Sequence, residues 1–262
     1  MNELRAHLRV IGMAFEVTMR HNFADTFILF GVFVQPLLVA LLALWMLRDE
    51  GGASIIYVVI GSGMTGLWTA ALFMGGTSIT SERWMGTLES LVAVPAPLQT
   101  IVLGKNLANI VQSLGAMVVS YVVASLIFGG LPEVSRPGWF LLALLLSVLA
   151  YIICGLLLGT LFILNPEITR FHNGMEFPVY ILAGFLFPVA LLPGWTTPLS
   201  YALAPYWAAR ALHAASGGGA TREIGASLGA LLVVSAVYLL IARFLFQRVI
   251  YRAKVEASLG RQ

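Results

Sequence analysis

Long apolar runs separated by short polar segments make up most of the chain. A helix of about 20 apolar residues crosses a hydrocarbon core roughly 30 Å thick. The runs predict six transmembrane helices, over residues 27–47, 54–76, 101–128, 139–164, 177–192 and 224–246. The fifth is the shortest and is interrupted by Pro188. We therefore expect an all-α polytopic membrane protein with a single transmembrane domain over residues 1–262.

The first 24 residues have a different pattern, with apolar side chains on one face of a helical wheel and charges elsewhere. This pattern is typical of a helix that lies in a membrane surface. A solvated helix packed on its own protein is the alternative. The apolar positions are Leu4, Leu8, Ile11, Phe15 and Met19, and the charged ones are Arg5, Arg9, Glu16 and Arg20.

Residues 195–215 are too apolar for a free loop, and Pro198 and Pro205 interrupt them. They predict one or two short helices that re-enter the outer leaflet between the fifth and sixth spans. Aromatic side chains favour the headgroup level, where we place Trp195, Tyr201, Tyr206 and Trp207. His213 is predicted to be an ordinary surface residue. In the other spans, Gln35-Pro36 predicts a kink, and glycines and serines in the second span predict close helix packing.

Composition and charge agree with this picture. The chain is 59% hydrophobic and 10% charged, whereas a soluble domain is about 25% charged. No alternation of the kind found in membrane β-barrels is present. Of the 15 Lys and Arg residues, only Arg48, Arg136, Arg210 and Arg222 fall outside if the N-terminus is cytoplasmic. The positive-inside rule then places both termini in the cytoplasm. The mild net charge of +3 gives no reason to expect a nucleic-acid partner.

Residues 79–94 form the most polar stretch in the first half of the chain. A helix there has Trp84 and Leu88 on one face and charges on the other, and it ends before Pro95 and Pro97. Proline lacks an amide hydrogen, and the residue before it avoids helical angles. We expect a short helix along the cytoplasmic membrane surface, held between the second and third spans.

This segment and its surroundings resemble the permease subunits of type-2 ABC exporters (ABC-2 membrane proteins). The matching residues are Ser78, Glu82, Arg83, Gly86, Thr87, Leu88, Glu89, Pro95, Gly104 and Lys105. The resemblance implies that residues 79–94 are a coupling helix that docks on a separate ATPase through Glu82, Arg83, Gly86, Thr87 and Glu89. It also implies two ATPase subunits per complex, a second permease (identical or homologous), surrounding lipid, and a bacterial plasma (inner) membrane. A loop helix that serves stability alone is the alternative.

The chain shows no ATP-binding motif of its own. The Gly104-Lys105 pair is followed by Asn106 and lacks a glycine at position 99, so it is not a phosphate-binding loop. We therefore expect a transport subunit that catalyses no bond chemistry and binds no cofactor. ATP and Mg²⁺ belong to the partner ATPase.

Residues 165–176 join the fourth and fifth spans. Glu167, Arg170 and His172 are candidates for a second cytoplasmic contact. His172 and Glu176 share the spacing of two metal ligands on one helix face, but two ligands are too few, and no metal is expected. Glu176 is the one carboxylate placed within the membrane, where charge is costly. It could pair with Arg170 or His172, line a transport pathway, or reach out to the interface.

Aromatic and methionine side chains of the second and fifth spans suit a hydrophobic or amphipathic cargo. Together with Glu176, the candidate pathway residues are Met64, Trp68, Phe73, Phe177 and Tyr180. Because these two spans meet across the dimer in the family, the resemblance supports a cavity there. Ordinary packing or lipid contact is the alternative for such side chains.

The sequence therefore predicts the permease of an ATP-driven exporter that moves an amphipathic drug, lipid or glycan-lipid outward. One alternative is a proton-coupled transporter with Glu176 or Asp25 as carrier, although no chain of mid-span ionisable residues supports it. The other is an intramembrane metalloenzyme using His172 and Glu176, which lacks a third ligand.

Overall fold

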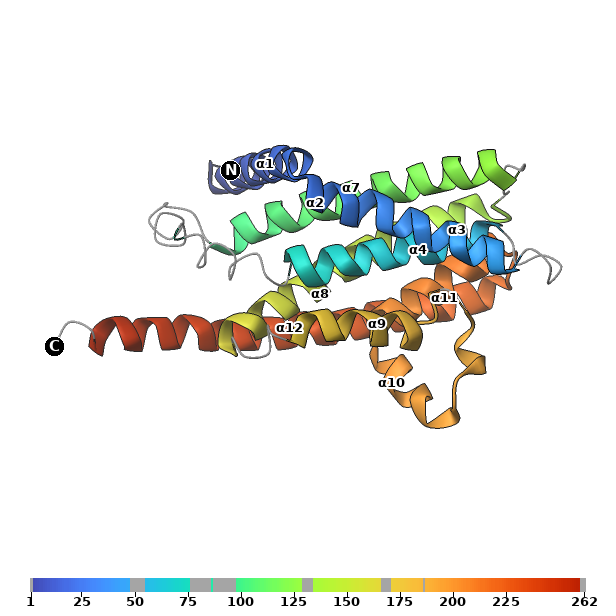
Figure 1. The fold of residues 1–262 in the computed structure, drawn as a ribbon. Coiled ribbons are helices and arrows are strands. Elements are labelled where there is room, and N and C mark those ends of the chain that lie inside the picture. Colours follow the sequence, from blue (N-terminus) through green and yellow to red (C-terminus); the bar gives the residue numbers. More distant parts are fainter. Residues whose placement is uncertain are drawn as a thin grey trace.

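The computed structural model describes residues 2–47, 55–75, 86, 98–128, 134–165, 171–185 and 187–259. Within these ranges every regular element is a helix and no strand occurs, which confirms the predicted all-α class. The helices form an elongated bundle (Figure 1). Both chain ends lie at the same end of this bundle.

The first predicted span is divided into three pieces. They are α2 (Thr26–Leu29), a π-helical turn η1 (Phe30–Val34) and α3 (Gln35–Leu47). Because Pro36 has no amide hydrogen, the regular helical bond to Val32 cannot form, and the π-helical turn lies directly before it. At the kink predicted for Gln35-Pro36, the structure thus has a π-helical turn.

The second span consists of α4 (Ile55–Thr69) and a π-helical segment η2 (Ala70–Gly75), and it packs on α7 (Leu98–Phe128). A Cβ added at Gly63 would lie 2.5 Å from Met117 Cγ, so only glycine lets this side chain approach the backbone of α4. One added at Gly66 would touch Pro36 Cγ at 3.4 Å. The close packing predicted from the small residues of this span is confirmed.

Three helices are long and apolar enough to cross a membrane, over Thr100–Ile127 in α7, Pro137–Leu164 in α8 (Pro137–Leu164) and Thr221–Arg248 in α12 (Thr221–Leu259). Shorter apolar helices cover Phe30–Leu42 and Ile56–Leu72. Three of the six predicted spans thus have spanning length within the described residues, and the others are shorter. The 39 residues of α12 extend about 58 Å, and its C-terminal part continues past the bundle (Figure 1).

The fifth predicted span, 177–192, requires correction. The helix there, α9 (His172–Leu182), begins earlier and ends ten residues sooner than expected. Gly184 has a φ of 66°, and the amides of Gly184 and Phe185 bond to the carbonyls of Ile181 and Tyr180. This is a Schellman motif, in which a left-handed glycine ends a helix. Hydropathy alone carries the predicted helix across this stop.

The segment predicted to re-enter the membrane contains two short turns, η4 (Val189–Leu191) and η5 (Gly194–Thr196), and two helices, α10 (Thr197–Ala202) and α11 (Ala204–Ser216). Pro198 and Pro205 each lie in the first turn of a helix, where a missing amide hydrogen costs nothing. The expectation for His213 is wrong. Its ring stacks on Tyr57 with centroids 3.7 Å apart, and its ring nitrogens are buried.

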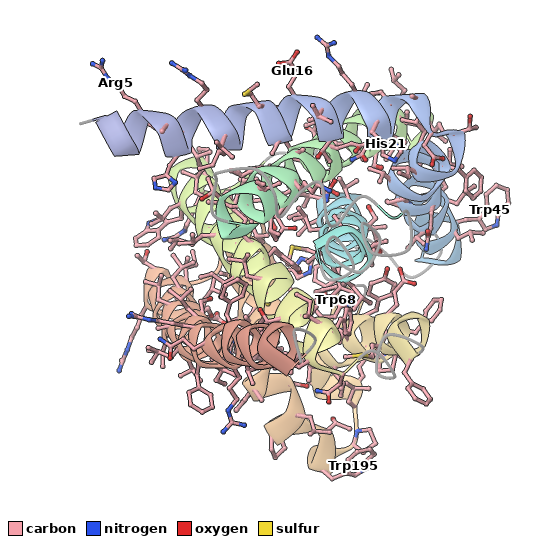
Figure 2. The ribbon with its side chains drawn as sticks, turned by 90° about the vertical axis from the view of Figure 1, so that its left-hand side faces the viewer. Arg5, Glu16, His21, Trp45, Trp68 and Trp195 are labelled. Atoms are coloured by element: carbon pink, nitrogen blue, oxygen red, sulfur yellow. The ribbon has the colours of Figure 1, made fainter. Side chains whose placement is uncertain are left out.

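The N-terminal helix α1 (Asn2–Ala24) matches the predicted boundaries and lies across one end of the bundle (Figure 2). Arg5 and Glu16 point away from the bundle in this view. The inward face shares Ile11, Phe15 and Met19 with the predicted apolar face, since these side chains are partly buried, whereas Leu8 is 58% exposed.

Candidate functional site

A carboxylate and two hydroxyls meet inside the bundle, where α9 faces the end of α4. Glu176 and Tyr180 lie one turn apart on α9, and Thr69 is the last residue of α4 before the π-helical segment η2. Glu176 is only 7% exposed. A buried carboxylate requires hydrogen-bond partners, because an unpaired one is strongly destabilising.

The three side chains form a closed triangle of short contacts. The hydroxyl of Tyr180 donates to Glu176 Oε1 at 2.5 Å, and Thr69 Oγ1 lies 2.8 Å from the same oxygen. The two hydroxyl oxygens are 2.7 Å apart. Each hydroxyl has one hydrogen and can accept two more. Thr69 can therefore donate to Glu176, to Tyr180 or to the carbonyl of Thr65, 2.9 Å away, so its hydrogen can be redirected without moving a heavy atom.

The helix ending at Gly184 holds Tyr180 in place. In a Schellman motif the residue after the glycine packs on the residue four positions before the glycine. Here the ring of Phe185, which is fully buried, lies 5.8 Å from the ring of Tyr180. The same turn that ends α9 therefore orients the Tyr180 hydroxyl toward Glu176.

These three side chains lie between an exposed aromatic ring and the buried core of the bundle. Phe177 is 60% exposed and meets the Tyr180 ring edge-on at 5.8 Å. On the inner side, Trp68 and Tyr151 belong to the main buried cluster of the bundle. Their Nε1 and hydroxyl atoms are buried without a hydrogen-bond partner in the described part of the chain. The arrangement presents a hydrogen-bonding centre beneath an exposed aromatic ring.

The predicted pathway residues separate into groups. The structure brings Glu176, Tyr180 and Phe177 together, whereas Met64 and Trp68 are core residues with at most 5% exposure. Figure 2 shows Trp68 among the helices of the bundle. The side chain of Phe73 lies outside the described residues. Glu176 turns inward instead of reaching out to the interface.

Thr69 was missed by the sequence analysis, which singled out aromatic, methionine and ionisable side chains. A threonine within an apolar span bonds by default to a carbonyl one turn earlier, as Thr69 also does here. The sequence around Thr69 gives no sign of its contact with Glu176, because that contact depends on how α4 and α9 pack.

The predicted ATPase-docking residues are almost entirely outside the described ranges. Of the segment 79–94 only Gly86 is described; it is exposed and has a φ of 71°. That angle belongs to a turn and not to a right-handed helix. Glu82, Arg83, Thr87, Glu89, Glu167 and Arg170 lie outside the described residues, and for His172 only the backbone is described, at the start of α9.

Metal-ligand chemistry has no support in the described part of the molecule. There, no three side chains of His, Cys, Asp or Glu come close enough to hold an ion. Cys154, the sole cysteine, is buried in α8. Asp25, the other candidate proton carrier, accepts the Ile28 amide at 3.3 Å, a contact typical of a helix N-terminus.

The membrane-length helices within the described residues identify a multi-pass membrane protein. The sequence profile of the family described as ABC-2 type transporter matches residues 12–215. The chain belongs to this family, and residues 12–215 correspond to its transmembrane permease domain. Permeases of this family generally pair with ABC ATPase subunits. A search of curated proteins found no match to the chain.

Proposed function

We propose that this chain is the permease subunit of an ATP-driven exporter in a bacterial plasma membrane. Two separate ATPase subunits bind and hydrolyse ATP, and a second permease, identical or homologous, completes the translocation unit. Membership of the ABC-2 family supports the ATPase partnership, and the polar triangle at Glu176 supports a pathway next to α4 and α9.

The termini are proposed to be cytoplasmic. They lie at the same end of the bundle (Figure 1). The elements at that end, α1, the start of α7 and the C-terminal part of α12, carry eight of the eleven Lys and Arg residues within the described ranges. Excess positive charge marks the cytoplasmic side of a membrane protein. In this orientation α1 lies at the cytoplasmic membrane surface, with Arg5 and Arg9 exposed toward lipid headgroups.

Segment 79–94 is proposed to be the coupling segment that docks on the ATPase, with a turn at Gly86. It joins the second span directly to α7, so a push from the ATPase on Glu82, Arg83, Gly86, Thr87 or Glu89 reaches both helices through the backbone. The same ATPase is also proposed to contact Glu167, Arg170 and His172. Through this second contact it would push on α9.

The cargo is proposed to be amphipathic, of drug, lipid or glycan-lipid type. Its apolar part would lie against the exposed Phe177 ring, and a hydrogen-bond-donating or cationic group would replace Thr69 at Glu176 Oε1. Thr69 retains the carbonyl of Thr65 as an alternative acceptor. The site can therefore accept cargo without leaving the buried Thr69 hydroxyl unpaired, which limits the free-energy difference between its loaded and empty states.

A proton-coupled transporter is the competing proposal, because Glu176 is a buried carboxylate with two hydrogen-bonding neighbours. It requires transport that continues without ATP and stops when the proton gradient is dissipated. ATP-driven export requires the reverse. The intramembrane metalloenzyme lacks a ligand set in the described residues and would need bound metal after purification.

The test of the ATPase partnership is a tagged pull-down from gently solubilised native membranes. A soluble ATPase is expected to copurify with the wild type and to be depleted by the Glu82→Ala, Glu89→Ala double substitution. The matched control is Glu16→Ala, which removes an exposed carboxylate on α1 that pairs with Arg20. An exposed pair of this kind contributes little to stability, so the control should retain the ATPase.

The outcomes separate the parts of the proposal. An ATPase held equally by wild type and the double variant would leave the exporter standing and reject the docking residues. If no ATPase copurifies even with the wild type, the exporter proposal fails and proton coupling takes its place.

A further inference from the structure

One face of α1 packs against the first turns of α7 through three groups of contacts, which follow one another along both helices. His7 Nδ1 lies 3.4 Å from Thr100 Oγ1, Ile11 and Ala14 lie against Gly104, and Asn22 meets Asn109 and Gln112. The contacting positions on α1 are separated by four, three and eight residues, which places them on one face of the helix. The contact therefore runs along most of α1, from its second turn to its last.

The middle group of contacts depends on the absence of a side chain at Gly104. A Cβ there would lie 2.6 Å from the carbonyl oxygen of Ile11 and 2.8 Å from Ala14 Cβ. The first of these neighbours is backbone, which cannot move aside as a flexible side chain can. Gly104 thus sets the distance between α1 and α7, a use of glycine common at helix crossings within membranes.

The last group of contacts is a buried cluster of amides. Asn22 Nδ2 donates both of its hydrogens, one to Asn109 Oδ1 and one to Gln112 Oε1, each at 2.8 Å. All three residues are 3% exposed. Moving α1 along α7 would break both hydrogen bonds and leave two acceptors and two hydrogens without partners while they remain buried, and that is costly. The cluster therefore resists sliding of α1 along α7.

We infer that Asn22 and Gly104 clamp α1 to α7, so that the two helices move as one body when the ATPase drives transport. The inference rests on the proposed function for its driving force, because α7 starts directly after the proposed coupling segment 79–94. Asn22 and Gly104 are positioning residues. Through them, a movement of α7 carries α1 with it along the membrane surface.

The test measures distances between spin labels in lipid nanodiscs by pulsed electron resonance. The labels are attached to cysteines introduced at exposed positions. Cys154→Ala removes the chain's own cysteine so that it takes no label. The first pair, Met13→Cys with Val118→Cys, joins α1 to α7. The second, Met13→Cys with Leu145→Cys, joins α1 to α8. Val118 is about 21 Å along α7 from Gly104, a range suited to the method.

If α1 is clamped to α7, the first pair of labels should give one narrow distance distribution. This distribution should not change when the partner ATPase and ATP with vanadate are added. The second pair should shift under the same conditions. Two variants should broaden the first distance, Asn22→Leu and Gly104→Ala. Gly115→Ala is the matched control, because a Cβ at Gly115 on the same helix meets no atom within 4 Å.

The clamp is overturned if the first distance changes with nucleotide, or if neither variant broadens it. It is also overturned if the second distance stays fixed while ATP is hydrolysed, because α1 then does not move. The nucleotide-free comparison of wild type, Asn22→Leu and Gly104→Ala needs no ATPase. It therefore decides whether the clamp exists even if the pull-down shows that the exporter proposal is wrong.

Discussion

The helices α9 and α11 lie on either side of the same loop but are held in opposite ways. Along α11, small side chains pack directly on α8, α12 and α4, and Ala204, Ala208, Ala211, Leu212 and Ala215 are fully buried. In contrast, α9 leaves Phe177 and Ile181 exposed. Its polar attachment to α4 is the triangle of Thr69, Glu176 and Tyr180.

The difference separates scaffold from working surface. Close packing of alanines has one arrangement, because any shift opens voids or clashes. Hydroxyls that share one carboxylate oxygen can exchange partners at little cost. Backbone bonds reinforce the scaffold, since Ser135 and Arg136 donate to the carbonyls of Ser216 and Ala215 at 3.1 and 3.2 Å. We therefore expect substitutions in α11 to reduce stability and substitutions in the triangle to reduce transport.

The largest loss of stability should occur when the pH is lowered far enough to protonate His213, which is buried on α11. This helix is not among the spanning ones, and burial lowers the pKa of His213 to about 4, against 6.5 ordinarily. His213 is neutral in the folded protein. Above pH 6.5 it is neutral in the unfolded chain as well, so folding does not require it to lose a proton and stability is highest there. Stability is then lost as the pH falls toward 4. The difference corresponds to on the order of 3 kcal/mol.

Thermal unfolding in detergent from pH 8 to pH 4 checks this. His213→Phe keeps a ring to stack on Tyr57 and should flatten the fall in melting temperature between pH 6.5 and 4. An equally steep fall in both proteins would mean that His213 titrates normally.

The next effect is overpacking of the scaffold. Ala208 is fully buried, so Ala208→Leu should lower the free energy of unfolding by about 1–3 kcal/mol. Ala226→Leu, at an exposed position of α12, is the matched control and should change little. If both variants unfold alike, α11 is not the tightly packed element described above.

A smaller loss is expected where α9 ends. Gly184→Ala forces a side chain into a left-handed conformation, costing about 1–2 kcal/mol, and places it 2.6 Å from Val189 Cγ2. Transport should fall as well, because the turn orients Tyr180. Gly174→Ala, in the same helix with no neighbour near the added Cβ, should leave both properties intact. Unfolding and transport measured on the same preparations test this.

The smallest loss of stability should follow Glu176→Gln. The side chain keeps its shape and an oxygen that accepts from Tyr180 and Thr69, so the free energy of unfolding should change by less than about 1.5 kcal/mol. A loss as large as that of Ala208→Leu would make the triangle part of the scaffold and remove the contrast between the two helices.

Hydropathy along the chain predicts where the helices occur but not where they stop or face. It identifies α7, α8 and α12 well, since long apolar runs leave few alternatives in a membrane. It misses the end of α9 because Gly184 acts through backbone geometry and not through polarity. It places His213 at the surface, because the burial of this side chain depends on its packing against Tyr57. Thr69 joins the site through a contact between α4 and α9 that neither sequence segment encodes alone.

The most direct test is ATP-driven accumulation of a lipophilic cationic dye by inside-out proteoliposomes containing the permease and its ATPase. Glu176→Gln is compared with wild type and with Phe171→Ala, which removes a ring that is 70% exposed just before α9. We predict at least about a tenfold loss for Glu176→Gln, corresponding to about 1.4 kcal/mol, with unchanged melting temperature and full activity of the control. Equal accumulation by wild type and Glu176→Gln, or accumulation driven by a proton gradient without ATP, would contradict the account.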